Sequence, residues 1–257
     1  MMRKTSRSMA DGSAASRTFV LVHGAWHGGW CWRRVIAILA AHGHRVFAPT
    51  LTGLGERAHL VSKDISLRTH VDDVVALAAA EELNEFVLVG HSYAGLVISG
   101  AADVLRERVA HYVYLDAAVP ADMSRGVSVS WSDCIDAATR AARLASASEQ
   151  GNGVVSLPAP PASAFAVTER MDAEWLQRQL RPMPLQTFLG AVTFRNGGST
   201  GLKRTYIAAL NPEYGPLIPT RERIRGDKTW SFTTLDAGHD SMVTAPRELA
   251  TLLMSQA

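Results

Sequence analysis

Charge of one sign, cysteine and long apolar runs are all scarce in this sequence, and each scarcity excludes a class of protein. Lys and Arg total 26 against 24 Asp and Glu, so the formal net charge of +2 is too small to indicate binding to nucleic acid or to an anionic membrane. No apolar window reaches the length of a membrane span. We therefore expect neither nucleic acid nor a membrane among the partners.

The two cysteines, Cys31 and Cys134, lie far apart and form no spacing typical of a metal site. Two thiols in a chain of this length indicate a reducing compartment, so we expect a cytoplasmic location and no disulfide. The ordinary interpretation of both residues is as small, partly buried apolar side chains. The sequence predicts neither a metal nor an organic cofactor.

The first 17 residues differ in composition from the rest of the chain. They are polar, rich in Ser and Ala, include Arg3, Lys4, Arg7 and Arg17, and contain no apolar run long enough for a signal peptide. We expect residues 1–17 to form a disordered leader. The full chain of 257 residues, 47% apolar and 19% charged, is long enough for one α/β domain with a substantial core.

Short apolar runs typical of β-strands alternate with helical patterns along most of the chain. Near-continuous apolar runs are typical of parallel strands covered on both faces. The predicted strands cover residues 18–22, 45–48, 86–89, 112–115, 205–210 and 229–235, and the predicted helices lie near residues 30–42, 69–83, 93–107, 219–226 and 245–255. Thr69 and Asp72 are spaced as a capping box for the second helix. The alternation predicts an α/β fold with a doubly wound, mostly parallel sheet.

This alternation breaks between about residues 117 and 197. Short helical pieces flank a loop at residues 146–161 that is rich in Gly, Ser and Pro. Long connections without regular structure are usually lids or binding loops. The insert directly follows a predicted strand, so we expect residues 117–197 to form a helical cap over an active site. Residues 18–116 and 198–257 would then form the core.

The segment at residues 86–95, FVLVGHSYAG, carries the strongest functional signal. An apolar strand runs directly into Ser92 and a helix follows, which is the layout of a nucleophile elbow. Ala94 stands where the usual motif has its last glycine, and Gly95 comes next; only small side chains fit where strand and helix cross closely. We predict that Ser92 is a catalytic nucleophile. The alternative is a strand-to-helix turn without catalysis.

A second motif, VLVHGAW at residues 20–26, also ends an apolar strand. A His-Gly turn at this place lets backbone N–H groups point into the site. We predict that the N–H groups of Ala25 and Tyr93 form an oxyanion hole. For His23 we favour a structural role in the turn, whereas His27 either lines the pocket or lies on the surface.

The base that activates a serine on such a sheet comes last in the chain. The segment LDAGHD at residues 235–240 places His239 just after the final predicted strand, so His239 is the predicted base. The remaining histidines in helix ends, strand starts or loops have a solvated role by default: His42, His44, His59, His70 and His111.

The acid that orients the imidazole has two candidates. The usual position follows the strand at 205–210, where Glu213 is the possible carboxylate. Asp116 ends the preceding strand and can reach the same histidine from the neighbouring side. We favour Asp116 over Glu213, because a triad is defined by geometry rather than by position. Asp116 has a helix cap or a hinge contact as its ordinary interpretation, and Asp236 and Asp240 are too close to His239 in sequence to reach its ring easily.

Large apolar side chains in the predicted cap offer walls for a substrate pocket. The cap contributes Trp131, Phe165, Met171, Trp175, Leu176, Leu180 and Phe188, with Trp26 and Trp30 below them. We predict a pocket that includes Trp26, His27, Trp131 and Trp175, although a stripe such as the one around Trp175 more often packs internally. Because pockets are mostly apolar, we expect a small-to-medium hydrophobic or aromatic ester as the substrate.

Together these motifs resemble those of α/β-hydrolases of the plant methylesterase and hydroxynitrile lyase type, including their bacterial esterase relatives. The resemblance covers about residues 18–116 and 203–255 and rests on FVLVHGAWHGGWCW at 19–32, TGLG at 52–55, GHSYAG at 90–95 and GHDSM at 238–242. It implies the α/β-hydrolase fold. It also implies Ser92 as nucleophile, His239 as base, and Ala25 with Tyr93 as the oxyanion hole.

Two positions depart from the pattern of this family. Its usual aspartate after the penultimate strand is not visible, whereas other α/β-hydrolase families place the acid after the strand that Asp116 ends. The lyase branch has a lysine directly after its catalytic histidine, which holds a cyanide leaving group. Asp240 stands there in this chain, and a carboxylate would repel cyanide.

We therefore expect a carboxylic ester hydrolase that acts through an acyl-enzyme on a small-molecule ester. Three alternatives remain: a hydroxynitrile lyase, a C–C or amide hydrolase on the same fold, and a ligand-binding homologue without turnover. A homodimer is a further open prediction.

Overall fold

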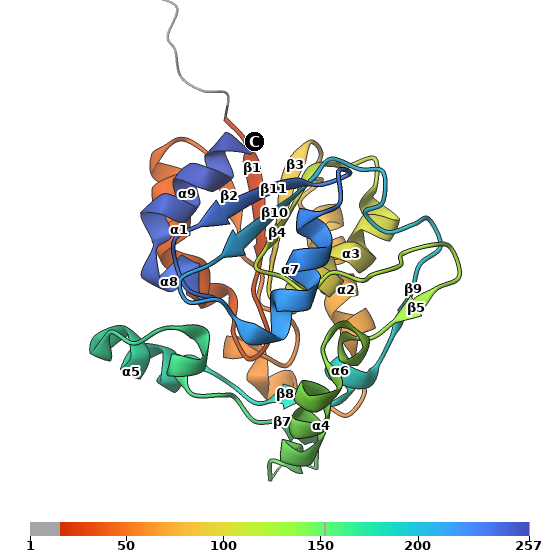
Figure 1. Ribbon diagram of the computed structural model, residues 1–257, viewed down its shortest axis with the longest axis vertical. Helices are drawn as coiled ribbons and strands as arrows, with labels where there is room; N and C mark the ends of the chain where they lie inside the picture. Colours follow the sequence, from red (N-terminus) through yellow and green to blue (C-terminus); the bar gives the residue numbers. More distant parts are fainter. Residues whose placement is uncertain (1–15, 152, 257) are drawn as a thin grey trace, which may run out of the picture.

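The computed structural model describes residues 16–151 and 153–256, so the leader predicted at residues 1–17 lies almost entirely outside the described residues. A six-stranded sheet in the order β11-β10-β4-β3-β1-β2 forms its centre (Figure 1). Every neighbouring pair is parallel. The strands are β1 (Thr18–Val22), β2 (Arg45–Phe47), β3 (Phe86–His91), β4 (Val109–Leu115), β10 (Arg204–Ala209) and β11 (Ser231–Leu235).

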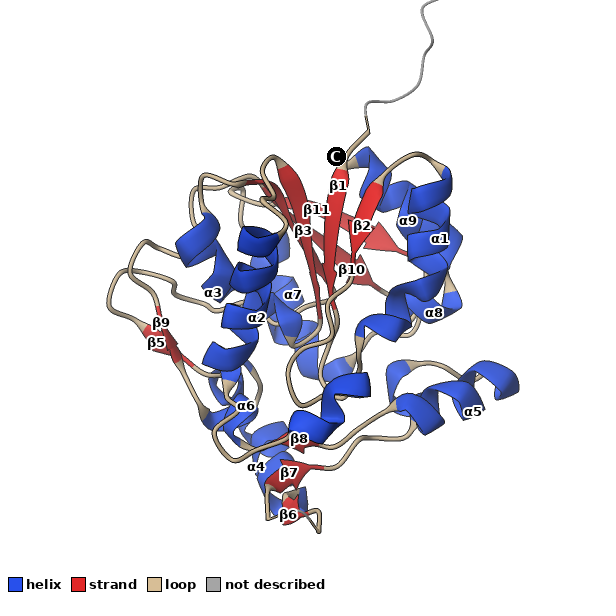
Figure 2. Cartoon of the chain, turned by 180° about the vertical axis from the view of Figure 1, so that it is seen from behind, coloured by secondary structure: helices blue, strands red, loops and turns tan. Residues whose placement is uncertain are grey.

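Helices cover both faces of this sheet. Figure 2 shows α1, α8 and α9 on one side and α2, α3 and α7 on the other. Their bounds are α1 (Arg33–Ala41), α2 (Leu67–Ala80), α3 (Ala94–Leu105), α7 (Ile218–Arg225), α8 (Ser241–Thr244) and α9 (Pro246–Ser255), with short 3-10 turns at Gly29–Trp32, Gly55–Leu60 and Gly215–Leu217. The doubly wound α/β fold predicted from the sequence is thus confirmed. None of the described helices is both long and apolar enough to cross a membrane.

The apolar runs of the sequence become the buried centre of the sheet. Every residue of β3 and of β10 is buried, as expected for strands with helices on both faces. All six predicted strands and all five predicted helices of the core occur, with ends that shift by a few residues. Because β3 is buried along its whole length, both of its ends lie inside the core, and Ser92 directly follows its last residue, His91.

The start of α2 differs from the prediction. The helix begins at Leu67, and its capping box joins Ser66 to Thr69, whose hydroxyl accepts the Ser66 N–H at 3.2 Å. Asp72 instead forms a surface ion pair with Arg68 at 2.8 Å. The spacing of Thr69 and Asp72 was misleading because Ser66, one turn earlier, takes the extended conformation that an N-cap requires.

Residues 117–197 form a separate layer of short elements at one end of the sheet (Figures 1 and 2). They comprise β5 (Ser128–Val129), a 3-10 turn (Trp131–Cys134), α4 (Ala137–Ser146), β6 (Ser148–Glu149), β7 (Val155–Leu157), a 3-10 turn (Ala162–Phe165), α5 (Arg170–Gln179), β8 (Met183–Pro184), α6 (Gln186–Leu189) and β9 (Val192–Thr193). The insert is therefore mixed rather than purely helical.

The loop predicted at residues 146–161 contains two strands, so that prediction was wrong. β6 pairs antiparallel with β7, and β7 pairs with β8. Gly151 and Gly153 adopt positive φ angles of 79° and 76° between β6 and β7, and the Glu149 carboxylate accepts the Gly153 N–H at 2.6 Å. The glycine-rich composition thus belongs to the turn of a hairpin, not to a structureless loop.

Cys31 and Cys134 are free thiols in apolar surroundings. Burial raises the pKa of Cys134 to about 12 and also raises the pKa of Cys31, so both thiols stay protonated at neutral pH. Cys31 is buried and Cys134 is partly buried, which fits the interpretation as small, partly buried apolar side chains.

The close crossing of α3 and the segment after β4 depends on Gly95. A Cβ atom at Gly95 would lie 2.9 Å from the Ala117 Cβ and closer still to the Ala118 carbonyl oxygen. Neither neighbour is the end of a flexible side chain, so α3 would have to shift.

We expect Gly95→Ala to lower the free energy of unfolding by about 1–3 kcal/mol, the usual cost of overpacking a core. Gly226→Ala is the matched control, because its Cβ would make only an ordinary 3.9 Å contact with the Arg223 carbonyl oxygen; we expect a change within about 0.5 kcal/mol. Urea denaturation measures both. Equal stabilities of the two variants would contradict the packing argument.

Candidate active site

Ser92 occupies a sharp turn between β3 and α3. Its φ angle of +55° lies in the left-handed region, which a side chain other than glycine adopts only when its surroundings hold it there. Those surroundings are visible: the Ser92 N–H donates to the Leu115 carbonyl at 3.2 Å, and the Ser92 carbonyl accepts from Gly95 and Ala118 at 3.1 and 2.9 Å. The turn is therefore tied to β4 as well as to α3. It has the geometry predicted for a nucleophile elbow.

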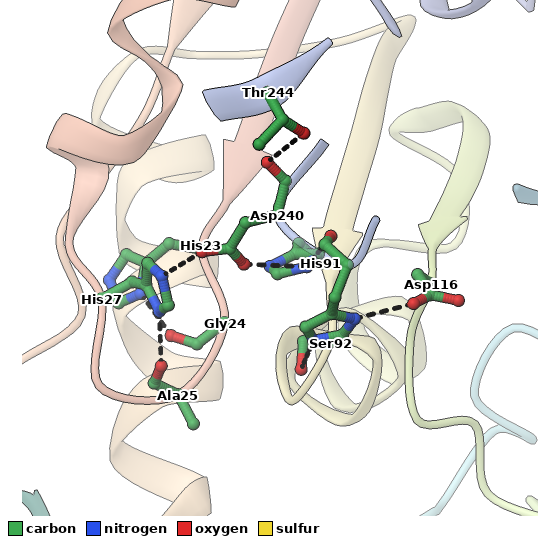
Figure 3. Close-up of polar contacts among 10 residues, drawn as sticks. His23, Gly24, Ala25, His27, His91, Ser92, Asp116, Asp240 and Thr244 are labelled. Atoms are coloured by element: carbon green, nitrogen blue, oxygen red, sulfur yellow. Dashed lines mark hydrogen bonds and ion pairs between the residues drawn. The ribbon is translucent and has the colours of Figure 1, made fainter. Parts of the chain in front are cut away.

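Ser92, His239 and Asp116 form a continuous chain of hydrogen bonds; Figure 3 labels its two ends, Ser92 and Asp116. His239 follows β11, and its Nε2 lies 2.9 Å from the Ser92 Oγ. Its Nδ1 lies 2.7 Å from the Asp116 Oδ2, and Asp116 is fully buried at the end of β4. A carboxylate only accepts, so the proton is on Nδ1 and the Nε2 lone pair faces the serine hydroxyl. The structure thus brings all three predicted residues together.

The charge of Asp116 is held by two partners. Its Oδ1 accepts a hydrogen bond of 2.7 Å from the Nη2 of Arg221, a buried residue of α7. Burial alone would raise the pKa of Asp116, but the bond from His239 and the Arg221 cation outweigh it and keep this pKa below its usual value. The acid is therefore ionised at neutral pH.

Glu213, the alternative acid, does not reach His239. Its carboxylate is 44% exposed and pairs with the Nη1 of Arg221 at 2.8 Å. Arg221 therefore bridges Glu213 and Asp116. The sequence reasoning missed Arg221, because a buried arginine in a helix that also contains Arg223 and Arg225 has no pattern of its own.

His23 fixes the direction of one predicted oxyanion donor. Its Nε2 accepts the Leu51 N–H at 3.0 Å, so its Nδ1 carries the only ring proton and donates to the Gly24 carbonyl at 2.8 Å. Burial lowers the pKa of His23 to about 3, which keeps the ring neutral. The Gly24 carbonyl and the Ala25 N–H share one planar trans peptide and point in opposite directions. His23 thus has the structural role in the turn that we favoured.

The loop that contains Ala25 packs directly against the serine. A Cβ at Gly24 would lie only 3.0 Å from the Ser92 Cβ, so the two motifs touch. Ala25 and Tyr93 are both buried, and within the described chain their N–H groups donate to no protein acceptor. Unpaired buried N–H groups are rare and require an explanation.

His27 is neither on the surface nor available to a ligand through its ring nitrogens. The ring is 1% exposed; its Nδ1 lies 2.7 Å from the Ala25 carbonyl oxygen and its Nε2 lies 2.9 Å from the Asp240 Oδ2. Asp240 is fully buried beside it, so its carboxylate faces a histidine rather than a leaving group. The sequence argument that Asp240 would repel cyanide therefore does not describe this geometry.

The predicted pocket tryptophans lie in two separate places. Trp131 packs with its ring centroid 5.0 Å from that of Tyr93 and 5.7 Å from that of Trp26, next to the serine turn. Trp175 packs instead against Trp30 at 5.3 Å, with the Arg33 guanidinium 4.0 Å from its ring. Trp26 and Trp131 thus adjoin the site, whereas Trp175 makes internal contacts, as the stripe around it suggested.

Tyr214 is a neighbour of the site that the sequence reasoning missed. Its ring stacks on His239 with centroids 4.0 Å apart and an interplanar angle of 18°. Tyr214 and His239 both line a cavity of about 330 Å³; its other lining residues are Ser163, Ala164, Ala166, Pro212, Glu213, Gly215 and Pro216. A cavity therefore lies next to His239 on the side of the insert.

One cluster in the described chain has the composition of a metal site. His91, His239 and Asp240 place ligand atoms within 4.8 Å of one another. Both ring nitrogens of His239 are already bonded to Ser92 and Asp116. A metal here would have to break the chain of hydrogen bonds that the serine depends on.

Comparisons with known proteins agree with the geometry. A family model described as "Alpha/beta hydrolase family" matches residues 19–252. The chain is 38% identical to "Carbendazim hydrolyzing esterase" of Nocardioides sp. (strain SG-4G) over 90% of its own length and 96% of that protein. It is 26% identical to "Methylesterase 7" of Arabidopsis thaliana over 93% of its length and 95% of that protein.

Solved structures show the same fold at low sequence identity. An extracellular alpha/beta-hydrolase from a Paenibacillus species superposes with a TM-score of 0.78 at 23% identity, over 94% of this chain and 99% of that one. Polyneuridine aldehyde esterase superposes with a TM-score of 0.74 at 22% identity, over 94% and 99% of the two chains. The resemblance inferred from the motifs is confirmed, and the chain belongs to the alpha/beta hydrolase family.

Proposed function

We propose that the protein is a carboxylic ester hydrolase that forms an acyl-enzyme on Ser92. The observation that carries this proposal is the hydrogen-bond chain from the Ser92 hydroxyl through His239 to Asp116, with distances of 2.9 and 2.7 Å. The names of the relatives, an esterase and a methylesterase, support the same reaction class.

In the proposed mechanism, His239 takes the Ser92 proton while the hydroxyl oxygen attacks the ester carbonyl. The oxyanion that develops accepts hydrogen bonds from the unpaired N–H groups of Ala25 and Tyr93, and such fixed donors act most strongly in a water-poor site. His239 then protonates the leaving alcohol, and water repeats the sequence to release the acid. Asp116 stabilises the imidazolium at each stage.

Every group in these steps belongs to the chain, and the ester and water are the only other reactants. The lyase alternative is disfavoured, because the position after His239 holds no cation that would stabilise cyanide. A ligand-binding role without turnover is disfavoured by the complete hydrogen-bond chain. The cytoplasmic location and the homodimer stay predictions from the sequence.

We further propose that residues 117–197 act as the cap and select the substrate. The insert supplies Trp131 and Phe188, whose ring centroids lie 5.2 Å apart, and Trp131 touches both Tyr93 and Trp26. Arg143 of α4 covers this cluster with its guanidinium 4.2 Å from the Trp131 ring. An aromatic enclosure beside the serine favours a small-to-medium hydrophobic or aromatic ester.

We expect Ser92→Ala to lower kcat for p-nitrophenyl acetate and butyrate by at least about 10³-fold, because the variant has no nucleophile. A fluorophosphonate probe should label the wild type at Ser92 and leave the variant unlabelled. Spectrophotometric rates and mass spectrometry of the labelled peptide measure the two effects. A wild type that neither turns over these esters nor reacts with the probe is not a serine hydrolase.

We expect Asp116→Asn to lower kcat by about 10⁴-fold, because an amide partner favours the wrong imidazole tautomer. Glu213→Gln is the matched control and should stay within a few-fold of the wild type, since the Glu213 carboxylate pairs with Arg221, whereas the hydrogen bond to His239 comes from Asp116. Steady-state rates on p-nitrophenyl butyrate compare the two variants. The reverse order of activities would assign the acid to Glu213.

We expect Trp131→Phe to raise KM for p-nitrophenyl butyrate about 5-fold more than for the acetate, since the smaller ring leaves the longer acyl chain about 1 kcal/mol less well covered. Trp175→Phe makes the same chemical change on the Trp30 side and should leave the ratio of the two KM values unchanged. The assignment of Trp131 to the substrate pocket fails if Trp131→Phe leaves the ratio of the two KM values unchanged.

A further inference from the structure

A second buried Asp–His pair lies beside the proposed triad and has no part in the mechanism above. His27 and Asp240 are 1% and 0% exposed and are joined by a contact of 2.9 Å. Figure 3 shows Asp240 between His27 and His91, on the opposite side of the serine turn from Asp116. A buried ion pair is costly to desolvate and adds little stability by itself, so its presence next to a site requires a reason.

The hydrogen bonds of His27 fix its protonation state. Both of its partners, the Ala25 carbonyl and the Asp240 carboxylate, are acceptors, so both ring nitrogens must donate and the ring is an imidazolium. His23, four residues earlier, faces one acceptor and one donor and is neutral. Two buried histidines of one turn therefore differ in charge because their hydrogen-bond partners differ.

The groups around Asp240 are consistent with this assignment. Burial alone would lower the pKa of His27 and raise that of Asp240, but their mutual attraction outweighs it, so the pKa of His27 rises and that of Asp240 falls. His91 lies 3.9 Å from Asp240, and burial lowers its pKa to about 3, so its ring is neutral. Cys31 is also close and stays a thiol. Among the described residues, His27 is thus the only cation within ion-pair distance of Asp240.

The contact of His27 with Ala25 acts on the oxyanion loop. His23 holds the carbonyl of the peptide before Ala25, and His27 holds the carbonyl of the peptide after it, at 2.8 and 2.7 Å. Between Ala25 and His27 the chain passes through Trp26 with a φ angle of +65°, a conformation that costs about 1–3 kcal/mol for a side chain of this kind unless it is held. The two histidines therefore clamp the Ala25 backbone from both sides.

We propose that His27, kept charged by Asp240, is a positioning residue that fixes the Ala25 N–H of the oxyanion hole. The proposal rests on the ester hydrolase function proposed above. Asp240 stands where the lyase branch has a lysine. In this proposal its carboxylate acts on the oxyanion loop rather than on a leaving group.

Two substitutions of His27 distinguish a role in positioning the Ala25 N–H from a purely structural role. The amide nitrogen of Asn is as many bonds from Cα as Nδ1, so His27→Asn keeps the donor to Ala25 and leaves the Asp240 charge unpaired. The amide nitrogen of Gln matches Nε2 instead, so His27→Gln keeps the donor to Asp240 and loses the one to Ala25. A purely structural role predicts that activity and thermal stability fall together in both variants.

We expect the two measurements to diverge. His27→Asn should have the lower Tm of the two, because a buried carboxylate without its partner is strongly destabilising. His27→Gln should have the lower kcat for p-nitrophenyl acetate, by up to about 100-fold, with KM changed less, because a displaced oxyanion donor affects mainly the transition state. Activities that follow the order of the Tm values would overturn the proposal.

The double variant His27→Asn/Asp240→Asn covers the case in which His27→Asn does not fold. It removes the unpaired charge and keeps the donor to Ala25, so we expect it to recover Tm and to exceed the kcat of His27→Gln. A double variant as inactive as His27→Gln would also overturn the proposal.

A readout independent of activity is the ¹⁵N NMR spectrum of the histidine rings in the wild type between pH 6 and 8. We expect both nitrogens of His27 to show imidazolium shifts, and this signal to change in Asp240→Asn. A neutral His27 ring would overturn the proposal. If the wild type shows imidazolium shifts but no ester turnover, the proposed function fails, and the positioning role fails with it.

Discussion

The site depends on one buried carboxylate that stays ionised, that of Asp116. A carboxylate with no exposed surface would normally take up a proton, and a protonated acid would lack the negative charge that stabilises the imidazolium of His239. The hydrogen bond from His239 and a 2.7 Å hydrogen bond from Arg221 of α7 together prevent this. The pair of Asp116 and Arg221 links the end of β4 to α7 and keeps the acceptor for the His239 Nδ1 proton in place. The Nε2 lone pair of His239 then faces Ser92. Removal of the Arg221 guanidinium would therefore disturb the site through Asp116.

The same principle, that the partners of a histidine set its charge, explains both Asp–His pairs. His239 faces a carboxylate and a hydroxyl that can donate, so one ring proton is enough and the ring is free to take another. His27 faces a carboxylate and a carbonyl, so both ring nitrogens must carry protons. The first arrangement suits proton transfer and the second suits a fixed hydrogen bond. One ring can therefore move protons while another, closely placed, holds the backbone still.

Residues at the ends of buried strands could be predicted from the sequence, because apolar runs mark strands and parallel strands end at one edge. Ser92, Asp116 and His239 were found in this way. Arg221, Tyr214 and the pair of His27 with Asp240 were not, since their roles come from contacts between distant segments; His27 and Asp240 are 213 residues apart. Local spacing also misplaced the capping box of α2, where Ser66 had the better backbone conformation.

The insert was the least predictable part for a related physical reason. No residue of α4 is buried, and its least exposed positions are the polar residues Thr139, Arg140 and Arg143. The apolar positions of this helix therefore do not mark the face that packs, as they do in an ordinary amphipathic helix. Its contact with the site comes from one long side chain, Arg143, whose guanidinium lies over Trp131. A cation–π contact of this kind contributes about 0.5–2 kcal/mol and needs only the two side chains, not a periodic face. Side chains of the insert can therefore change without disturbing the strand ends that position Ser92, Asp116 and His239. An apolar run in the sequence marks those strand ends, whereas no such pattern marks Arg143.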